Sequence, residues 1–355
     1  MAKLNDGGGA LPNEVANFYS DTQTKPTRAM RETVLEAAVG DEQKGEDPTT
    51  AALCARVADL LGKEDAVFMP SGTMCNEIAL YIHCRRGDEI ICERSSHIVN
   101  FEAGGPAAFA GAATHPLDGE HGRFTAEQVS DAIREDVGLH LPETALVSVE
   151  QTANMGGGAI WPLAQLDAVA RVAKDAGIAT HMDGARLFNA SVKSGVAAKD
   201  FAAGYDSVWV DFTKGLGCPL GAVLAGSKDF VQRAKRVKQM IGGGLRQSGF
   251  VTAACHYALD HHVERLAEDH DLAAEIGRAV GQMPLVQKLL PVETNIVIFD
   301  IVPEGPTADE VVGRLREERL LIGALDERRI RVVTHLDVDA ADGERLCAAL
   351  KVQLS

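Results

Sequence analysis

The sequence predicts an α/β protein with a mainly parallel sheet in a large domain, followed by a small α+β C-terminal domain. Short apolar runs alternate with amphipathic helical patterns from about residue 17 to 230, as in sheets whose crossover helices cover both faces. Beyond about residue 270, two strand-like runs flank one helical pattern. We therefore expect a flexible N-terminal arm over residues 1–16, a large domain over 17–269 and a small domain over 270–355.

Six apolar runs have the length and composition of buried strands. They are residues 66–69, 89–92, 146–149, 178–182, 208–211 and 222–225. Apolar residues at three- and four-residue spacing predict a helix over 163–176, and a long apolar stripe predicts one over 247–283. The C-terminal part is expected to contain strands over 295–299 and 329–333 and a helix over 308–318.

Composition narrows the class of partner. The formal net charge is −16 over 355 residues, which argues against nucleic acid or an anionic membrane as partner. The seven cysteines are scattered and form no C-x-x-C, so we expect neither a disulfide framework nor a metal site. The N-terminus lacks the apolar stretch of a signal peptide, and we expect a cytoplasmic protein that binds a small molecule.

A lysine and an aspartate follow two of the predicted strands. Lys214 comes just after the run 208–211 and precedes two glycines, and Asp183 directly follows the run 178–182. A lysine that can form a Schiff base, with an aspartate that can hold a pyridinium nitrogen, is what pyridoxal 5′-phosphate chemistry requires. The alternatives are a solvated loop lysine and an aspartate that caps a turn. Together the two residues favour the cofactor.

Ser71, Gly72 and Thr73 lie where the first predicted strand gives way to a helix. Free backbone N–H groups and hydroxyls at a helix N-terminus can bind a phosphate. The alternative is an ordinary N-cap on a strand–helix unit. With Lys214 and Asp183 in the same chain, phosphate binding is favoured.

Four further residues are candidates for the same site. His97 follows the second predicted strand and can stack on a ring or relay a proton, or it can simply start a helix. Arg186 can clamp a substrate carboxylate, or form a surface ion pair. Glu150 ends a strand and can contact the ring's 3-oxygen region or substrate. Arg246 follows three glycines and can reach phosphate, including across a subunit interface, or be a solvated helix end.

The sequence resembles the L-threonine aldolases, which are aspartate-aminotransferase-like, fold type I pyridoxal-phosphate enzymes. The resemblance runs through nearly the whole chain in matching order. It rests on Tyr19-Ser20-Asp21-Thr22, Gly45-Glu46-Asp47-Pro48, Pro70-Ser71-Gly72-Thr73-Met74, His97, His181-Met182-Asp183-Gly184-Ala185-Arg186, Thr213-Lys214-Gly215-Leu216-Gly217, Gly242–Gln247 and Arg331-Val332-Val333-Thr334-His335.

The resemblance implies a role for each matching residue. Lys214 is the Schiff-base lysine, Asp183 the pyridinium partner, and His97 the residue stacked on the ring. Phosphate is bound by Gly72, Thr73 and Arg246, and the substrate carboxylate by Ser20, Arg186 and Arg331. His140, ten residues before Glu150, matches a second active-site histidine near the substrate hydroxyl. The resemblance also implies homodimers or homotetramers with shared active sites.

Three departures from the family pattern, Tyr19, Lys44 and Ala153, fall near the substrate side-chain pocket of the family. The reaction we expect is retro-aldol cleavage of a β-hydroxy-α-amino acid, such as threonine or allo-threonine, into glycine and an aldehyde, with His97 or His140 as base. Two alternatives remain: a β-eliminating lyase or racemase that breaks Cα–H instead, and a non-catalytic carrier of the cofactor. A nucleotide-binding module is disfavoured because no phosphate-binding glycine motif follows a strand.

Overall fold

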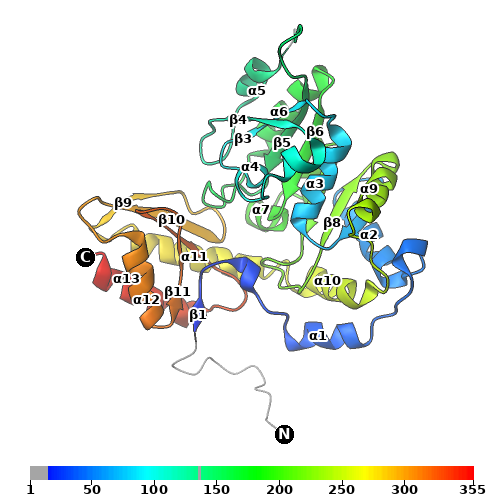
Figure 1. Ribbon diagram of the computed structural model, residues 1–355. Helices are drawn as coiled ribbons and strands as arrows, with labels where there is room; N and C mark the ends of the chain where they lie inside the picture. The colour runs from blue at the N-terminus through cyan, green and yellow to red at the C-terminus, as the bar shows by residue number, and fades with distance from the viewer. Residues whose placement is uncertain (1–14, 135–136) are drawn as a thin grey trace.

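The computed structural model describes residues 15–134 and 137–355. Figure 1 shows a seven-stranded sheet with its helices in the upper part of the view and a smaller four-stranded sheet to the left. Of the predicted arm, residues 1–14 lie outside the described residues, whereas Ala16 already begins β1 (Ala16–Asn17). No helix within the described ranges is long and apolar enough to cross a membrane.

The large sheet has the strand order β2-β8-β7-β6-β5-β3-β4. Its strands are β2 (Asp65–Met69), β3 (Glu89–Glu93), β4 (Ala113–Leu117), β5 (Thr144–Glu150), β6 (Ala179–Gly184), β7 (Ser207–Asp211) and β8 (Ala222–Gly226). β8 is antiparallel to both neighbours, and the other pairs are parallel. The six predicted strands are therefore confirmed. The edge strand β4 was not predicted, because its sequence, ATHPL, is only partly buried and lacks an apolar run.

Helices cover both faces of this sheet, as predicted. One face carries α3 (Gly72–His83), α4 (His97–Asn100) and α9 (Lys228–Met240), and the other carries α2 (Pro48–Leu60), α6 (Leu163–Asp175), α7 (Leu187–Ser194) and α8 (Ala198–Ala202). Residues of β7 alternate between the two cores: Val208 and Val210 belong to the core that also contains residues of α6 and α7, and Trp209 belongs to the core that contains residues of α3 and α9. A strand buried on both faces reads as a continuous apolar run, which is why these strands were predictable.

Other helices in the first part of the chain are α1 (Arg28–Leu35), α5 (Ala126–Ala132), η1 (Asp21–Gln23), η2 (Glu42–Lys44) and η3 (Pro106–Ala110).

The predicted long helix over 247–283 is wrong in one respect: it is two helices, α10 (Gly249–His261) and α11 (Leu266–Val280). Between them, the Nδ1 of His262 donates to the carbonyl of Leu216 at 2.7 Å, which ties the break to the loop behind Lys214. The apolar stripe continues across the break, so periodicity alone could not reveal it. After this break the chain continues as α11 into the C-terminal part (Figure 1).

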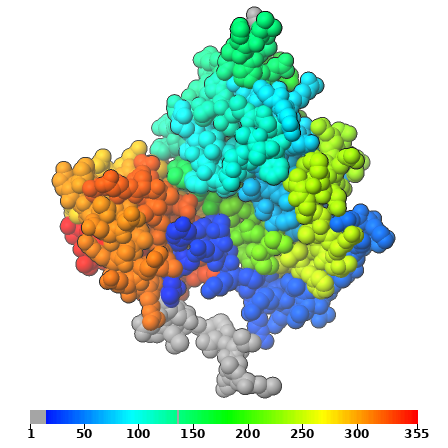
Figure 2. Space-filling view, viewed as in Figure 1, coloured from blue at the N-terminus to red at the C-terminus, as the bar shows by residue number. Residues whose placement is uncertain are grey.

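The C-terminal sheet is antiparallel, with the order β12-β13-β10-β9. Its strands are β9 (Val286–Leu289), β10 (Ile296–Ile301), β12 (Gly323–Ala324) and β13 (Arg329–Val333), and α11, α12 (Ala308–Glu317) and α13 (Ala340–Gln353) pack with it. Both predicted strands and the helix are confirmed. β1 pairs with β11 (Leu320–Leu321), and the first described residues lie against this part in Figure 2. The predicted division at residues 269 and 270 falls inside α11 and stays a prediction.

Candidate active site

Carboxylates end three neighbouring strands of the large sheet. Glu150, Asp183 and Asp211 are the last or nearly the last residues of β5, β6 and β7, and Glu150 pairs in register with Asp183. Lys214 follows Asp211, and its amine forms an ion pair with that carboxylate. The Lys214 Nζ lies 5.7 Å from the centre of the Trp209 ring. The chain thus places a mostly buried lysine at the edge of the sheet where ligands bind in open α/β folds.

Asp183 is buried and accepts two hydrogen bonds. Its Oδ2 accepts from Asn76 Nδ2 at 2.9 Å, and its Oδ1 accepts from the backbone N–H of Ala185 at 3.0 Å. Burial raises the pKa of Asp183, while His97, Asn76 and Lys214 act in the opposite direction. The bond to Ala185 shows that Asp183 does cap its turn. A cationic ligand at its remaining lone pairs would offset the cost of burying the carboxylate.

His97 begins α4 and is anchored at two points. Its backbone N–H donates to Glu150 Oε2 at 2.7 Å, and its ring Nδ1 lies 2.7 Å from Glu102 Oε1. Burial lowers the pKa of His97, but the hydrogen bond to Glu102 and the charge of Asp183 outweigh it, so the pKa is raised. His97 therefore both starts a helix and presents an imidazole held by a carboxylate.

Glu150 supports this arrangement rather than facing an open site. Its Oε1 accepts from the backbone N–H of Asn154 at 2.7 Å, and its Oε2 accepts from His97. Burial and the nearby Asp183 raise the pKa of Glu150. The side chain joins the start of α4 to the loop after β5.

The start of α3 has the form expected of an anion cradle. The Ser71 hydroxyl accepts from the Met74 N–H at 3.3 Å, so Ser71 is the N-cap. A Cβ on Gly72 would lie 2.2 Å from the Trp209 ring, so a larger residue does not fit without movement. Gly72 and Thr73 remain at the helix N-terminus, where backbone N–H groups are unpaired by the helix.

Two arginines lie near the same edge, and one is already paired. The Nε and Nη2 of Arg186 donate to Asp21 at 2.8 and 2.7 Å. Arg331 donates from Nη1 to Asn154 at 3.3 Å, while its buried Nε has no partner among the described residues. Burial and the proximity of Arg186 lower the pKa of Arg331. Arg331, more than Arg186, has donors available for an anion. Ser20, the third residue assigned to the substrate carboxylate, is buried and caps η1 beside Asp21.

Two of the predicted site residues, His140 and Arg246, form no hydrogen bond or ion pair with the other predicted site residues within the described part of one chain. His140 is exposed and lies just before β5, whereas Glu150 ends that strand, a separation of roughly 20 Å along a strand at about 3.3 Å per residue. Within one chain His140 therefore lies away from Glu150 and Asp183, and its role at an active site stays a prediction. Arg246 is exposed and its Nη1 donates to Asp41 at 2.9 Å. Lys44 is likewise exposed, at the end of η2.

Sequence reasoning missed Asn76 and Glu102. Asn76 lies in the second turn of α3 and touches Asp183, and Glu102 holds His97. Neither residue stands in a recognisable motif. They can be identified only from the folded structure, in which α3, β6 and the segment after α4 come into contact.

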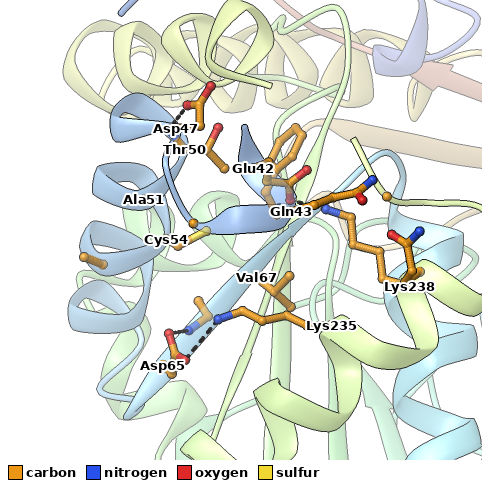
Figure 3. A pocket seen from close by; sticks show the side chains of 16 residues that line it. Glu42, Gln43, Asp47, Thr50, Ala51, Cys54, Asp65, Val67, Lys235 and Lys238 are labelled. Atoms are coloured by element: carbon orange, nitrogen blue, oxygen red, sulfur yellow. Dashed lines mark hydrogen bonds and ion pairs between the residues drawn. The ribbon is translucent and has the colours of Figure 1, made fainter. Parts of the chain in front are cut away.

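A separate cavity of about 530 Å³ lies between α2, β2 and α9 and contains none of the predicted site residues (Figure 3). Lys238 projects toward it, buried, with its amine paired to Glu42 and 6.0 Å from the Phe68 ring centre. Lys235 pairs with Asp65 at 3.5 Å at the other side. Both lysines of this cavity are thus ion-paired, and none of the predicted site residues lines it.

Comparisons with known proteins agree with this geometry. A family model described as beta-eliminating lyase matches residues 17–303. The chain is 38% identical to the probable low-specificity L-threonine aldolase 2 of Arabidopsis thaliana, over 92% of this chain and 94% of that protein. It is 39% identical to the low specificity L-threonine aldolase of Escherichia coli (strain K12), over 91% and 94%. The solved structure of Leishmania major threonine aldolase superposes with a TM-score of 0.81 at 19% identity, covering 96% of this chain and 99% of that one, which supports the fold type I architecture.

Proposed function

This chain belongs to the beta-eliminating lyase family and, within it, to the L-threonine aldolases, and we propose that it is a pyridoxal-phosphate-dependent carbon–carbon lyase. It cleaves a β-hydroxy-α-amino acid, such as threonine or allo-threonine, to glycine and an aldehyde. The observation that supports the proposal is that Lys214, just after β7, lies close enough to Asp183, in β6, for its charge to oppose burial, which raises the pKa of that carboxyl, in a chain with these relatives.

The residues present fit the cofactor. Asp183 is a buried carboxylate with lone pairs to spare, which suits a pyridinium nitrogen. Gly72 lets the Trp209 ring pack directly against the start of α3, and the backbone N–H groups of that helix N-terminus suit a phosphate. Lys214 provides the amine. When bound, pyridoxal 5′-phosphate supplies a carbonyl that links to an amine and a ring that accepts electron density from the bond that breaks.

Arg331 is assigned to the substrate carboxylate. Its unpartnered Nε leaves a donor for a carboxylate oxygen, and Ser20 lies beside Asp21 on the neighbouring segment. Arg186 holds Asp21 in place and so shapes this end of the site. Fixing the carboxylate fixes which bond at Cα stands in the reactive orientation, and this selects C–C cleavage over loss of the Cα proton.

His97 is assigned as the base that takes the β-hydroxyl proton, directly or through a water molecule. Glu102 holds its Nδ1, which leaves Nε2 as the atom that can accept a proton from substrate. Loss of that proton, cleavage of Cα–Cβ and protonation of Cα give an aldehyde and glycine, and the atoms balance without an oxidant or reductant.

We further propose a homodimer or homotetramer with shared active sites, in the cytoplasm. His140 and Arg246 are both exposed in one chain, and both carry the assigned roles only if they serve a neighbouring copy. All seven cysteines are unpaired, which is typical of a reducing compartment.

A screen for released aldehyde tests the reaction. The holoenzyme is assayed with threonine, allo-threonine, phenylserine and 3-hydroxyaspartate, and pyruvate and ammonia are measured in parallel with serine. Aldehyde and glycine in equal amounts are expected. Pyruvate from serine without aldehyde from any β-hydroxy amino acid would favour the β-eliminating alternative. Racemised substrate without cleavage would favour the racemase.

A further inference from the structure

Asn76 has every hydrogen-bonding position of its side-chain amide filled. Its Nδ2 donates to Asp183 Oδ2 at 2.9 Å and to Glu102 Oε1 at 2.6 Å. Its Oδ1 accepts from Trp209 Nε1 at 2.6 Å and lies 3.0 Å from His181 Nε2. The residue is fully buried. We call Asn76, Asp183, Glu102, Trp209 and His181 the Asn76 network.

Trp209 fixes the orientation of this amide. An indole N–H can only donate, so the atom beside it must be the oxygen of Asn76. The nitrogen must then face the two carboxylates, where each of its hydrogens has an acceptor. A flipped amide would set its oxygen against Asp183 and Glu102 and leave the indole N–H unpaired.

A chain of hydrogen bonds continues from Asn76 away from the site, and it fixes which atoms carry the protons. His181 must carry its proton on Nε2 to donate to Asn76, because burial lowers its pKa to about 3 and it is neutral. Its Nδ1 then accepts from the Ser207 hydroxyl at 2.8 Å. The Ser207 oxygen in turn accepts from His83 Nε2 at 2.8 Å, and burial lowers the pKa of His83 to about 4. One consistent set of donors thus runs from His83 to Asp183.

The same amide separates two like charges. Glu102 is close enough to Asp183 to raise the pKa of that carboxyl, and Asn76 places one N–H on each. Behind Glu102, burial and the Glu102 charge raise the pKa of Glu77, whose carboxyl oxygens have no other partner among the described residues. Removing the amide donors would leave Asp183 and Glu102 facing each other with one fewer donor each.

We propose that Asn76 is a positioning residue. It holds Asp183 toward the pyridine nitrogen and, through Glu102, holds His97, so that both groups keep a fixed relation to the cofactor. The proposal rests on the proposed function, because it requires Asp183 to face a bound pyridine ring. Asn76 itself touches neither substrate nor cofactor in this account.

Asn76→Asp tests the proposal because it keeps the shape of the side chain and removes its two donors. In the holoenzyme, the added negative charge should move the pH midpoint of the bound-cofactor absorbance change upward by about one unit. Loss of hydrogen bonds to charged groups should lower kcat by about tenfold or more, with KM within about twofold. Because an added carboxyl can move the midpoint whatever the role of Asn76, the deciding variant is the uncharged Asn76→Ala. A purely structural role would leave the absorbance midpoint and the kcat of folded Asn76→Ala unchanged.

Matched variants separate these effects from instability. Cys75→Ala changes a buried apolar residue next to Asn76 that makes none of the Asn76 hydrogen bonds, and it should lower the melting temperature without moving the midpoint. Asn76→Ala, which removes the donors without adding charge, decides the test even if Asn76→Asp does not fold: it should lower kcat about as much.

The outcomes are distinguishable. A normal midpoint and normal kcat in Asn76→Asp, with a wild-type cofactor band present, would overturn the positioning role alone. A wild-type protein that binds no pyridoxal 5′-phosphate would overturn the proposed function and this inference with it. A loss of kcat in Asn76→Ala no larger than in Cys75→Ala would also overturn the positioning role.

Discussion

Arg186 and Asp21 form a buried ion pair with two hydrogen bonds, at 2.8 and 2.7 Å, and Asn295 adds a third donor to Asp21 at 3.1 Å. The pair joins the segment after β1 to the turn that follows Asp183. Because these hydrogen bonds hold its planar guanidinium in one orientation, Arg186 forms a rigid boundary of the site. Arg331, by contrast, keeps a buried Nε that has no partner among the described residues.

Arg331→Lys should weaken substrate binding. A lysine keeps the charge but loses the planar fork, so KM for the amino acid should rise by about tenfold or more, while the affinity for the cofactor stays the same. Steady-state kinetics and cofactor titration measure the two quantities. Arg329→Lys is the control, because Arg329 lies on the same strand and pairs with Asp300. Equal KM values for wild type and Arg331→Lys would remove Arg331 from the substrate site.

Asp21→Asn should destabilise the protein at neutral pH. It leaves the buried Arg186 unpaired, which typically costs about 3–5 kcal/mol in the free energy of unfolding. Although burial raises the pKa of Asp21, Arg186 outweighs it and holds the pKa well below its usual range. This stabilisation is present above the unfolded-state pKa of about 4 and is lost as pH falls. Denaturant unfolding should show a gap between wild type and variant at pH 7 that narrows toward pH 3. A gap independent of pH would contradict the ionic origin.

Glu102→Gln should move the acidic limb of the pH profile. His97 must be neutral to accept a proton, so activity rises with pH through its pKa. Glu102 raises that pKa, and removing its charge should shift the limb of kcat/KM to lower pH by about one unit. Profiles from about pH 5 to 9 are compared with those of Glu120→Gln, an exposed carboxylate. An unmoved limb would mean that His97 is not the titrating base.

The strands could be predicted from the sequence because burial on both faces leaves continuous apolar runs. The ligand-binding edge could be predicted because ligands bind at the carboxyl ends of parallel strands. Lys214, Asp183 and His97 follow from that. The break between α10 and α11 was not predictable, since it depends on His262 reaching the Leu216 carbonyl from another element. Asn76 was equally hidden, because its partners come from β6, β7 and the segment after α4. Contacts between distant segments leave no local pattern.

A mixture of Lys214→Ala and His140→Ala chains tests whether active sites are shared. Each variant alone should lose most of its activity. If His140 serves a neighbouring copy, a mixed assembly contains some sites with a native Lys214 from one chain and a native His140 from the other, and activity returns. If each site uses its own His140, every site in the mixture carries one substitution. Activity that stays at the level of the separate variants, in assemblies proven to be mixed, would contradict the shared site.

The most direct measurement of the central claim is the chemical identification of the lysine that holds the cofactor. The protein is loaded with pyridoxal 5′-phosphate, reduced with borohydride and digested, and the labelled peptide is sequenced by mass spectrometry. The account predicts a stable label on Lys214, absent from Lys214→Ala. A label on Lys238, the buried lysine of the separate cavity, or on any other lysine in place of Lys214, would contradict it.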